Sequence, residues 1–213
     1  MKRRRSGPPS LAKLTAPTLP VVVSRPRLFR LLDRACKQKI AWIVGPPGSG
    51  KTTLVASYLQ ARKLKPFWYQ VDEGDNDPAT LIHYLSLAAQ RAAPRYRTPL
   101  PHLTPEYLPG LPIFARRFFE QLYQRVSART TLVFDNYHTI ATASSTHELL
   151  LAAIETLPTS TSLIILSRTD PPAAVARWQA EQRIAMIDES ALRMTEEEAW
   201  RLVRCHVMGA RPW

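Results

Sequence analysis

Eight residues at positions 45–52 have the types and spacing of a phosphate-binding loop. They are Gly45, Pro46, Pro47, Gly48, Ser49, Gly50, Lys51 and Thr52, which match the pattern G-x-x-x-x-G-K-[ST]. In this pattern the glycines let backbone N–H groups curl around phosphate oxygens, the lysine reaches the β- and γ-phosphates, and the threonine hydroxyl binds Mg²⁺. A chance Gly/Pro turn is the simpler alternative. The flanking sequence argues against it, because an apolar stretch precedes the loop and an apolar-rich helical stretch, including Thr53 as a further candidate contact, follows it.

Asp135 is the candidate partner of Thr52 in holding a magnesium ion. It follows the apolar residues 131–134, which predict a strand that closes on a carboxylate. In P-loop nucleoside triphosphatases such an aspartate holds Mg²⁺ opposite the loop Ser or Thr. An aspartate that merely caps a strand end is the alternative. The phosphate loop favours the metal role, so we predict Thr52 and Asp135 as the metal ligands.

Asn136 and Arg168 complete the candidate catalytic set with Lys51 and Asp135. Many ATPases with an additional strand in the sheet carry a second acid near this position, and the amide of Asn136 can hydrogen-bond a water but cannot take its proton. General-base help is typically worth ~10²–10⁴-fold, so we expect slow hydrolysis or binding without turnover. Arg168 follows an apolar stretch and could sense the γ-phosphate and stabilise transition-state charge. A surface arginine paired with Asp170 is the alternative.

The rest of the sequence predicts alternating strands and helices that would position these residues. We expect strands at 40–44, 66–71, 131–134, 162–166 and 184–187, and helices at 26–35, from 51, at 79–91, 114–126, 148–157 and 173–180, and from a capping box at 195–198 towards 206. Residues 94–112 indicate a long proline-rich loop. The alternation predicts a parallel sheet covered on both faces, whose ligands bind at the carboxyl ends of the strands. The phosphate loop, Asp135 and Arg168 all fall at those ends.

Composition restricts the class of protein further. With 213 residues, 45% hydrophobic and 22% charged, the chain fits one globular domain with at most a fragment of a second. No apolar stretch is long enough to cross a bilayer, residues 6–10 lack the apolar character of a signal peptide, and Cys36 and Cys205 are far apart. We therefore expect a cytoplasmic protein with reduced thiols and no membrane partner.

The net charge of +12 raises the question of nucleic-acid binding. The arginines are scattered apart from the basic run at residues 2–5, and no compact basic helix or zinc-finger spacing is present in the sequence. We do not expect direct DNA binding by this chain. Contact with nucleic acid through the basic surface stays open as an alternative, and it would weaken steeply with salt.

Seven segments together resemble a known family. They are residues 13–17, 22–28, the phosphate loop, 71–78, 134–138, 167–172 and 192–199, of which Asp-Glu-Gly-Asp-Asn-Asp-Pro at 72–78 and Ser-Arg-Thr-Asp-Pro-Pro at 167–172 are the most specific. The chain resembles the nucleotide-binding domain of the MalT-like regulators, large ATP-binding relatives of the LuxR type in the STAND class of signalling P-loop NTPases. The resemblance implies a three-layer α/β sandwich of the additional-strand (ASCE) type, with a mainly parallel sheet of about five strands in the order 5-1-4-3-2.

The resemblance also implies a function and a division of the chain. It implies an ATP/ADP switch in transcriptional regulation that uses Mg²⁺, with Lys51 on the β/γ-phosphates, Thr52 and Asp135 on the metal, Arg168 on the γ-phosphate and residues 22–27 near the adenine. We expect a basic, Pro-rich arm at 1–24, the NTPase domain at 25–190, and at 191–213 the start of a helical lid that is truncated. Expected partners are ATP and either further copies of the chain or C-terminal regulator domains.

Two functions remain open at this point. One is the switch domain, with weak Mg²⁺-dependent ATP hydrolysis at most. The other is a non-hydrolysing module that binds nucleotide or a protein partner, as a truncated remnant of such a regulator.

Overall fold

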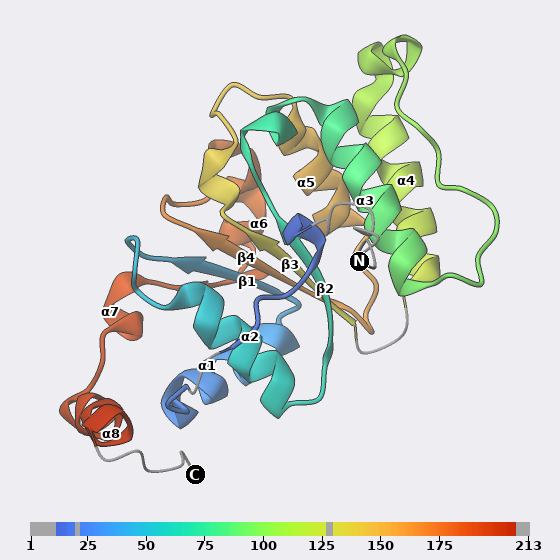
Figure 1. Cartoon of the computed structure of the whole chain (residues 1–213). Helices are drawn as coiled ribbons and strands as arrows, with labels where there is room; N and C mark the ends of the chain where they lie inside the picture. Colours follow the sequence, from blue (N-terminus) through green and yellow to red (C-terminus); the bar gives the residue numbers. More distant parts are fainter. Residues whose placement is uncertain (1–11, 20–21, 127–129, 208–213) are drawn as a thin grey trace, which may run out of the picture.

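Five parallel strands form one sheet in the order β2-β3-β4-β1-β5 (Figure 1). The strands are β1 (Ile40–Val44), β2 (Lys65–Gln70), β3 (Thr130–Asp135), β4 (Ser162–Ser167) and β5 (Ile184–Ile187). Counted from the other edge the order is 5-1-4-3-2, which confirms the expected sheet. The structure, a computed structural model, describes residues 12–19, 22–126 and 130–207, so the first eleven residues of the expected arm lie outside it, as does the side chain of Cys205.

Helices cover both faces of the sheet and make a three-layer sandwich (Figure 1). One face carries α1 (Pro26–Lys37), α2 (Lys51–Ala61) and the short α7 (Glu189–Leu192). The other carries α3 (Pro78–Ala92), α4 (Leu111–Arg125), α5 (Thr146–Glu155) and α6 (Ala176–Ala180). The last helix, α8 (Glu196–Val207), follows α7 at the phosphate-loop side of the molecule. No helix in the described ranges combines the length and apolar composition that crossing a bilayer needs.

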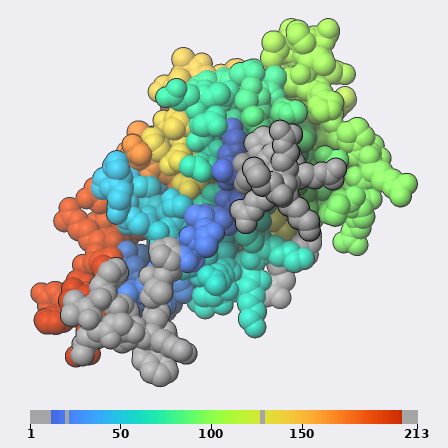
Figure 2. Space-filling view, in the orientation of Figure 1, coloured from blue at the N-terminus to red at the C-terminus, as the bar shows by residue number. Residues whose placement is uncertain are grey.

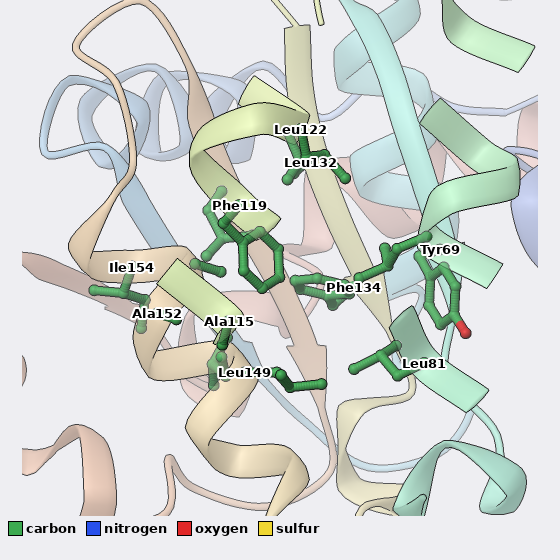
Figure 3. Close-up of a cluster of buried hydrophobic side chains, with 14 of the residues drawn as sticks. Tyr69, Leu81, Ala115, Phe119, Leu122, Leu132, Phe134, Leu149, Ala152 and Ile154 are labelled. Carbon is green, nitrogen blue, oxygen red and sulfur yellow. The ribbon is translucent and has the colours of Figure 1, made fainter. Parts of the chain in front are cut away.

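Alternation along the strands divides the core into two layers. In β1, Ile40 and Trp42 point into the layer under α3 to α6, whereas Ala41 and Ile43 point into the layer under α1 and α2. Figure 3 shows the larger layer, in which side chains of α4 and α5 meet Leu132 and Phe134 of β3. A strand buried on both faces must be apolar at nearly every position, which is why the strand stretches could be found in the sequence.

The structure changes the prediction for residues 94–112. Instead of one long loop, the segment contains the 3-10 helix η3 (Pro105–Gly110), and α4 already begins at Leu111, three residues before the predicted start. Two of the prolines that suggested a loop stand where helices tolerate them: Pro105 begins η3, and Pro112 lies in the first turn of α4 and has no N–H to lose there. The helix α7 was not predicted; it has only four residues.

An N-terminal segment, residues 12–19, packs on the domain (Figure 2). It contains the 3-10 helix η1 (Ala12–Leu14), whose Lys13 ammonium lies 2.8 Å from Asp72 Oδ2 and 3.1 Å from Asp75 Oδ1. The same ammonium lies 4.3 Å from the centre of the Tyr84 ring. These contacts tie the segment to the acidic turn 72–77, although the sequence suggested only a Pro-rich arm.

Candidate functional site

The phosphate loop joins the end of β1 to the start of α2, as the sequence predicted. Gly48 and Gly50 have φ of +77° and +80°, a left-handed conformation that side chains disfavour. At Gly45 an added Cβ would come within 2.9 Å of the end of the Leu192 side chain and 3.0 Å of Ser49 Oγ, so these side chains would have to shift to make room for it. The backbone therefore has the turn and the open face that a bound phosphate needs, and α2 directs its amino end at the same point.

Lys51 bends back over its own loop. Its Nζ donates to the carbonyl oxygens of Gly45 at 2.6 Å and Pro46 at 2.9 Å and to Ser49 Oγ at 3.2 Å. Burial and then the charge of Arg168 lower the pKa of the Lys51 ammonium, while Asp135 acts in the opposite direction. The ammonium thus stands at the mouth of the loop, held by acceptors that an anion could replace.

Thr52 and Asp135 meet across the site, as predicted for a metal-binding pair. Thr52 Oγ1 lies 3.1 Å from Asp135 Oδ2 and 3.3 Å from Oδ1. Burial raises the pKa of Asp135 and outweighs the Thr52 hydroxyl, the backbone of Asn136 and Lys51, which all lower it. One hydroxyl and one carboxylate suit Mg²⁺, an ion that keeps several waters and takes phosphate oxygens as further ligands. The described residues contain no cluster of three or more His, Cys, Asp or Glu arranged for a metal.

Arg168 lies close to the phosphate loop, at the end of β4. Its charge acts on both Lys51 and His138, lowering the pKa of each. The predicted alternative, pairing with Asp170, is not present: within the described ranges Arg168 forms no ion pair, and its side chain is exposed. The guanidinium is therefore free to meet an anion beside Lys51.

Asn136 and His138 follow Asp135 in the turn after β3. Asn136 has a φ of +63°, a left-handed position that asparagine tolerates better than most residues. The Nδ1 atom of His138 is buried without a hydrogen-bond partner in the described part of the chain, and burial, Arg168 and Lys51 lower the pKa of this histidine. His138 was not predicted as a site residue, although it stands three residues after Asp135 and within the resembling segment 134–138.

A cavity of about 220 Å³ opens beside the phosphate loop. Its walls come from three separate parts of the chain: residues 22–25 before α1, the loop with α2, and α8 with the residues before it. The lining residues are Val22, Val23, Arg25, Gly48, Ser49, Gly50, Thr53, Leu54, Ser57, Met194, Glu198 and Leu202. Three of the residues 22–27, which were expected near the adenine, line this cavity: Val22, Val23 and Arg25. The contribution of α8 was not predicted from the sequence.

A buried network holds α8 against the N-terminal wall of that cavity. Arg25 donates to Glu198 Oε2 at 2.8 Å through Nη2 and at 3.1 Å through Nε, and Nη2 also meets the carbonyl oxygens of Leu192 at 2.8 Å and Arg193 at 2.9 Å. Both Arg25 and Glu198 are buried. Arg27 adds hydrogen bonds to carbonyl oxygens of the same turn.

The predicted capping box at the start of α8 is confirmed, and it belongs to this network. Thr195 Oγ1 accepts from the Glu198 amide at 3.2 Å, and Glu198 Oε2 accepts from the Thr195 amide at 3.2 Å. Burial alone would raise the pKa of Glu198, but the hydrogen bonds from Arg25 and the Thr195 backbone and the charges of Arg25 and Arg27 outweigh it, so the pKa is lowered. Glu198 therefore has two functions, helix cap and ion-pair partner, of which the sequence revealed one.

Sequence comparison agrees with the resemblance drawn from the motifs. The chain is 31% identical over 199 residues, 92% of its length, to the HTH-type transcriptional regulator MalT of Cronobacter sakazakii (strain ATCC BAA-894). It is 31% identical over 203 residues, 93% of its length, to the HTH-type transcriptional regulator MalT of Serratia proteamaculans (strain 568). The chain spans 22% of the length of each of these relatives. No protein-family profile matches it.

Proposed function

We propose that this chain, MalT-like over nearly its whole length, is an ATP/ADP-binding switch domain of a transcriptional regulator. The observation that carries the proposal is the meeting of Thr52 and Asp135 at 3.1 Å beside a phosphate loop that also carries Lys51 and faces Arg168. A ligand that combines phosphate groups with a divalent cation would use all four side chains. The cavity lined by Val22 and Val23 offers an apolar space next to the phosphates for a base.

Each side chain would have a distinct role in holding the nucleotide. Lys51 would exchange the Gly45 and Pro46 carbonyls for phosphate oxygens, and Thr52 and Asp135 would hold Mg²⁺, which neutralises phosphate charge. Arg168 would distinguish ATP from ADP, because only ATP has a γ-phosphate for its guanidinium to pair with. Binding and discrimination of this kind suit a switch, since the two nucleotides then stabilise different states.

A thermal-shift experiment tests nucleotide binding. Ligand at 100 times its Kd adds about 2.7 kcal/mol to the stability of the folded state, which for a chain of this size corresponds to roughly 5–10 °C in Tm. We expect such a rise with ATP and Mg²⁺ for the wild type and none for Lys51→Ala. Lys65→Ala is the matched control, because Lys65 is an exposed lysine at the opposite, amino-terminal end of β2. A wild-type protein with no shift in saturating ATP or ADP contradicts the proposal.

A non-hydrolysing module is the second candidate function, and Asn136 is the observation that favours it. The residue directly after Asp135 is an amide, in a left-handed conformation that aspartate also tolerates. If the site is otherwise competent for hydrolysis, Asn136→Asp should raise the rate of Mg²⁺-dependent ATP hydrolysis clearly above the wild-type rate. An unchanged rate together with intact ATP binding favours the module.

A further inference from the structure

The turn that carries Arg168 is held by hydrogen bonds on both sides of the arginine. On the near side, the Gly45 amide donates to Ser167 O at 3.3 Å and so joins the phosphate loop to the end of β4. On the far side, the Thr169 amide donates to Ser167 Oγ at 3.0 Å. Because the Arg168 side chain has no hydrogen bond or ion pair with the residues that the structure describes, its direction depends on the backbone of this turn.

Trp42 reaches the same turn from the centre of the sheet. Its indole Nε1 donates to Thr169 O at 3.4 Å. Trp42 lies in β1 and is fully buried. A buried indole N–H needs an acceptor, and here the acceptor belongs to the residue directly after Arg168. A movement of the indole would therefore shift the backbone that sets the direction of the Arg168 guanidinium.

Tyr137 and His147 support Trp42 from the other side. The Trp42 and Tyr137 rings meet edge to face, with centres 5.4 Å apart and an angle of 80°. The Tyr137 hydroxyl lies 2.7 Å from His147 Nδ1, and His147 Nε2 lies 3.1 Å from Ala141 O. Since a carbonyl can only accept, Nε2 carries the proton and Nδ1 accepts from the tyrosine. All three side chains are buried. Their contacts form a continuous series, here called the brace, from His147 in α5 through Tyr137 and Trp42 to the Arg168 turn.

We propose that Trp42 is a positioning residue for Arg168, supported by Tyr137 and His147, and that it sets how well the site distinguishes ATP from ADP. The inference rests on the proposed function, because it assumes that Arg168 reads the γ-phosphate. Tyr137 follows Asp135 by two residues, so the brace joins the turn after β3 to the turn after β4. The residues that meet the metal and the γ-phosphate are thereby kept in a fixed relation.

The test compares ATP and ADP affinity in the full chain with Mg²⁺, by titration calorimetry. Trp42→Phe keeps an aromatic ring and removes the N–H. We expect the ratio of ATP to ADP affinity to fall about two- to tenfold, the loss of one hydrogen bond of ordinary strength, with ADP affinity unchanged within about twofold. Arg168→Ala shows how far the ratio of ATP to ADP affinity falls when the arginine is removed altogether. In the double variant, Trp42→Phe should add nothing further, because both changes act on one interaction.

Trp68→Phe is the matched control. Trp68 is also buried, but it lies in β2 and points into the layer under α2. A role limited to packing would lower stability in both tryptophan variants without changing the ratio in either. If Trp42→Phe does not fold, Tyr137→Phe decides the question. It removes only the bond to His147, and a smaller fall in the ratio is expected.

The outcomes separate the two proposals. An ATP preference that Arg168→Ala abolishes and that Trp42→Phe and Tyr137→Phe leave intact overturns the positioning role, while the proposed function stands. A wild-type chain that binds neither nucleotide, or whose preference for ATP does not depend on Arg168, overturns the γ-phosphate reading and the positioning role with it.

Discussion

The two ends of the candidate nucleotide site differ in whether their charged side chains are paired with one another. In the cavity beside the loop, Arg25 and Glu198 are buried and paired at 2.8 Å. At the phosphate end, the Lys51 ammonium contacts only neutral oxygens of its own loop, the Asp135 carboxylate accepts from a hydroxyl, and Arg168 has no ion-pair partner in the described ranges. Charges that are paired within the protein stabilise the fold, whereas charges without such partners remain available to a ligand.

This difference is visible in the pKa shifts of two carboxyl groups. The pKa of Glu198 is lowered, because Arg25 and Arg27 favour its charged form more than burial opposes it. The pKa of Asp135 is raised, because burial outweighs the groups around it. The charge of the first carboxylate therefore stabilises the fold at neutral pH, and the charge of the second destabilises it.

The largest expected effect is at Arg25. Arg25→Ala removes the partner of a buried carboxylate and the donor to two carbonyl groups, and breaking a buried pair costs about 3 kcal/mol or more. Urea denaturation should show this loss in the free energy of unfolding. Arg30 is an exposed arginine of α1, the helix that directly follows Arg25, and Arg30→Ala should change this free energy by no more than about 0.5 kcal/mol. Equal losses of unfolding free energy in the two variants would mean that the buried Arg25–Glu198 pair does not stabilise the fold, and would contradict the comparison.

A smaller effect is expected at Glu198. Glu198→Gln keeps an acceptor for Arg25 and loses the charge, so stability at pH 7 should fall by about 1.5 kcal/mol. Because the folded-state pKa is lowered, this contribution is present above the unfolded pKa of about 4.3 and is lost as pH falls through the folded pKa. Wild type and variant should therefore converge in melting experiments towards acid pH.

The control for Glu198 is its neighbour Glu197. Glu197 pairs with Arg201 at 2.6 Å on the exposed face of α8. Exposed pairs of this spacing contribute about 0.3–0.5 kcal/mol, so Glu197→Gln should be close to neutral at every pH. A pH-independent deficit of Glu198→Gln would mean that the carboxylate charge contributes nothing.

The smallest expected effect, of opposite sign, is at Asp135. Asp135→Asn keeps an acceptor for Thr52 and removes a buried charge, so the nucleotide-free protein should gain up to about 1 kcal/mol at pH 7. Because the folded-state pKa is raised, the wild type loses stability as pH rises from the unfolded pKa of about 3.9 through the folded pKa, and the variant does not. The same variant should lose the dependence of ATP binding on Mg²⁺. A variant less stable than the wild type at neutral pH would contradict this.

The sequence predicted that the loop, Asp135 and Arg168 lie at the same edge of the sheet, because the signals for them are local. The loop motif spans eight consecutive residues, and both Asp135 and Arg168 stand directly after buried apolar strands, whose parallel order brings their ends together. Helix boundaries near proline were less predictable. Pro112 is as compatible with the first turn of a helix as with a loop, and only packing of the α4 side chains decides between them.

The cavity end could not be predicted in the same way. Its far wall, Met194, Glu198 and Leu202, is distant in sequence from Arg25 and Val23 and matches no ligand-binding motif. The capping box predicted where α8 begins but not which surface its Glu198 would face. The Trp42 contact with Thr169 was also inaccessible, since a tryptophan in an apolar stretch indicates core packing and nothing about its N–H.

The packing of residues 12–19 affects whether the edge strand β2 can pair with a strand of another chain. Edge strands present unpaired backbone groups that can join another chain, and β2 is one edge of this sheet. Leu14 packs with the core layer on one side of the sheet, Ala16 and Leu19 pack with the layer on the other, and Lys13 fixes the crossing through Asp72 and Asp75. The N-terminal segment thus wraps around the exposed edge and shields it from strand addition and aggregation.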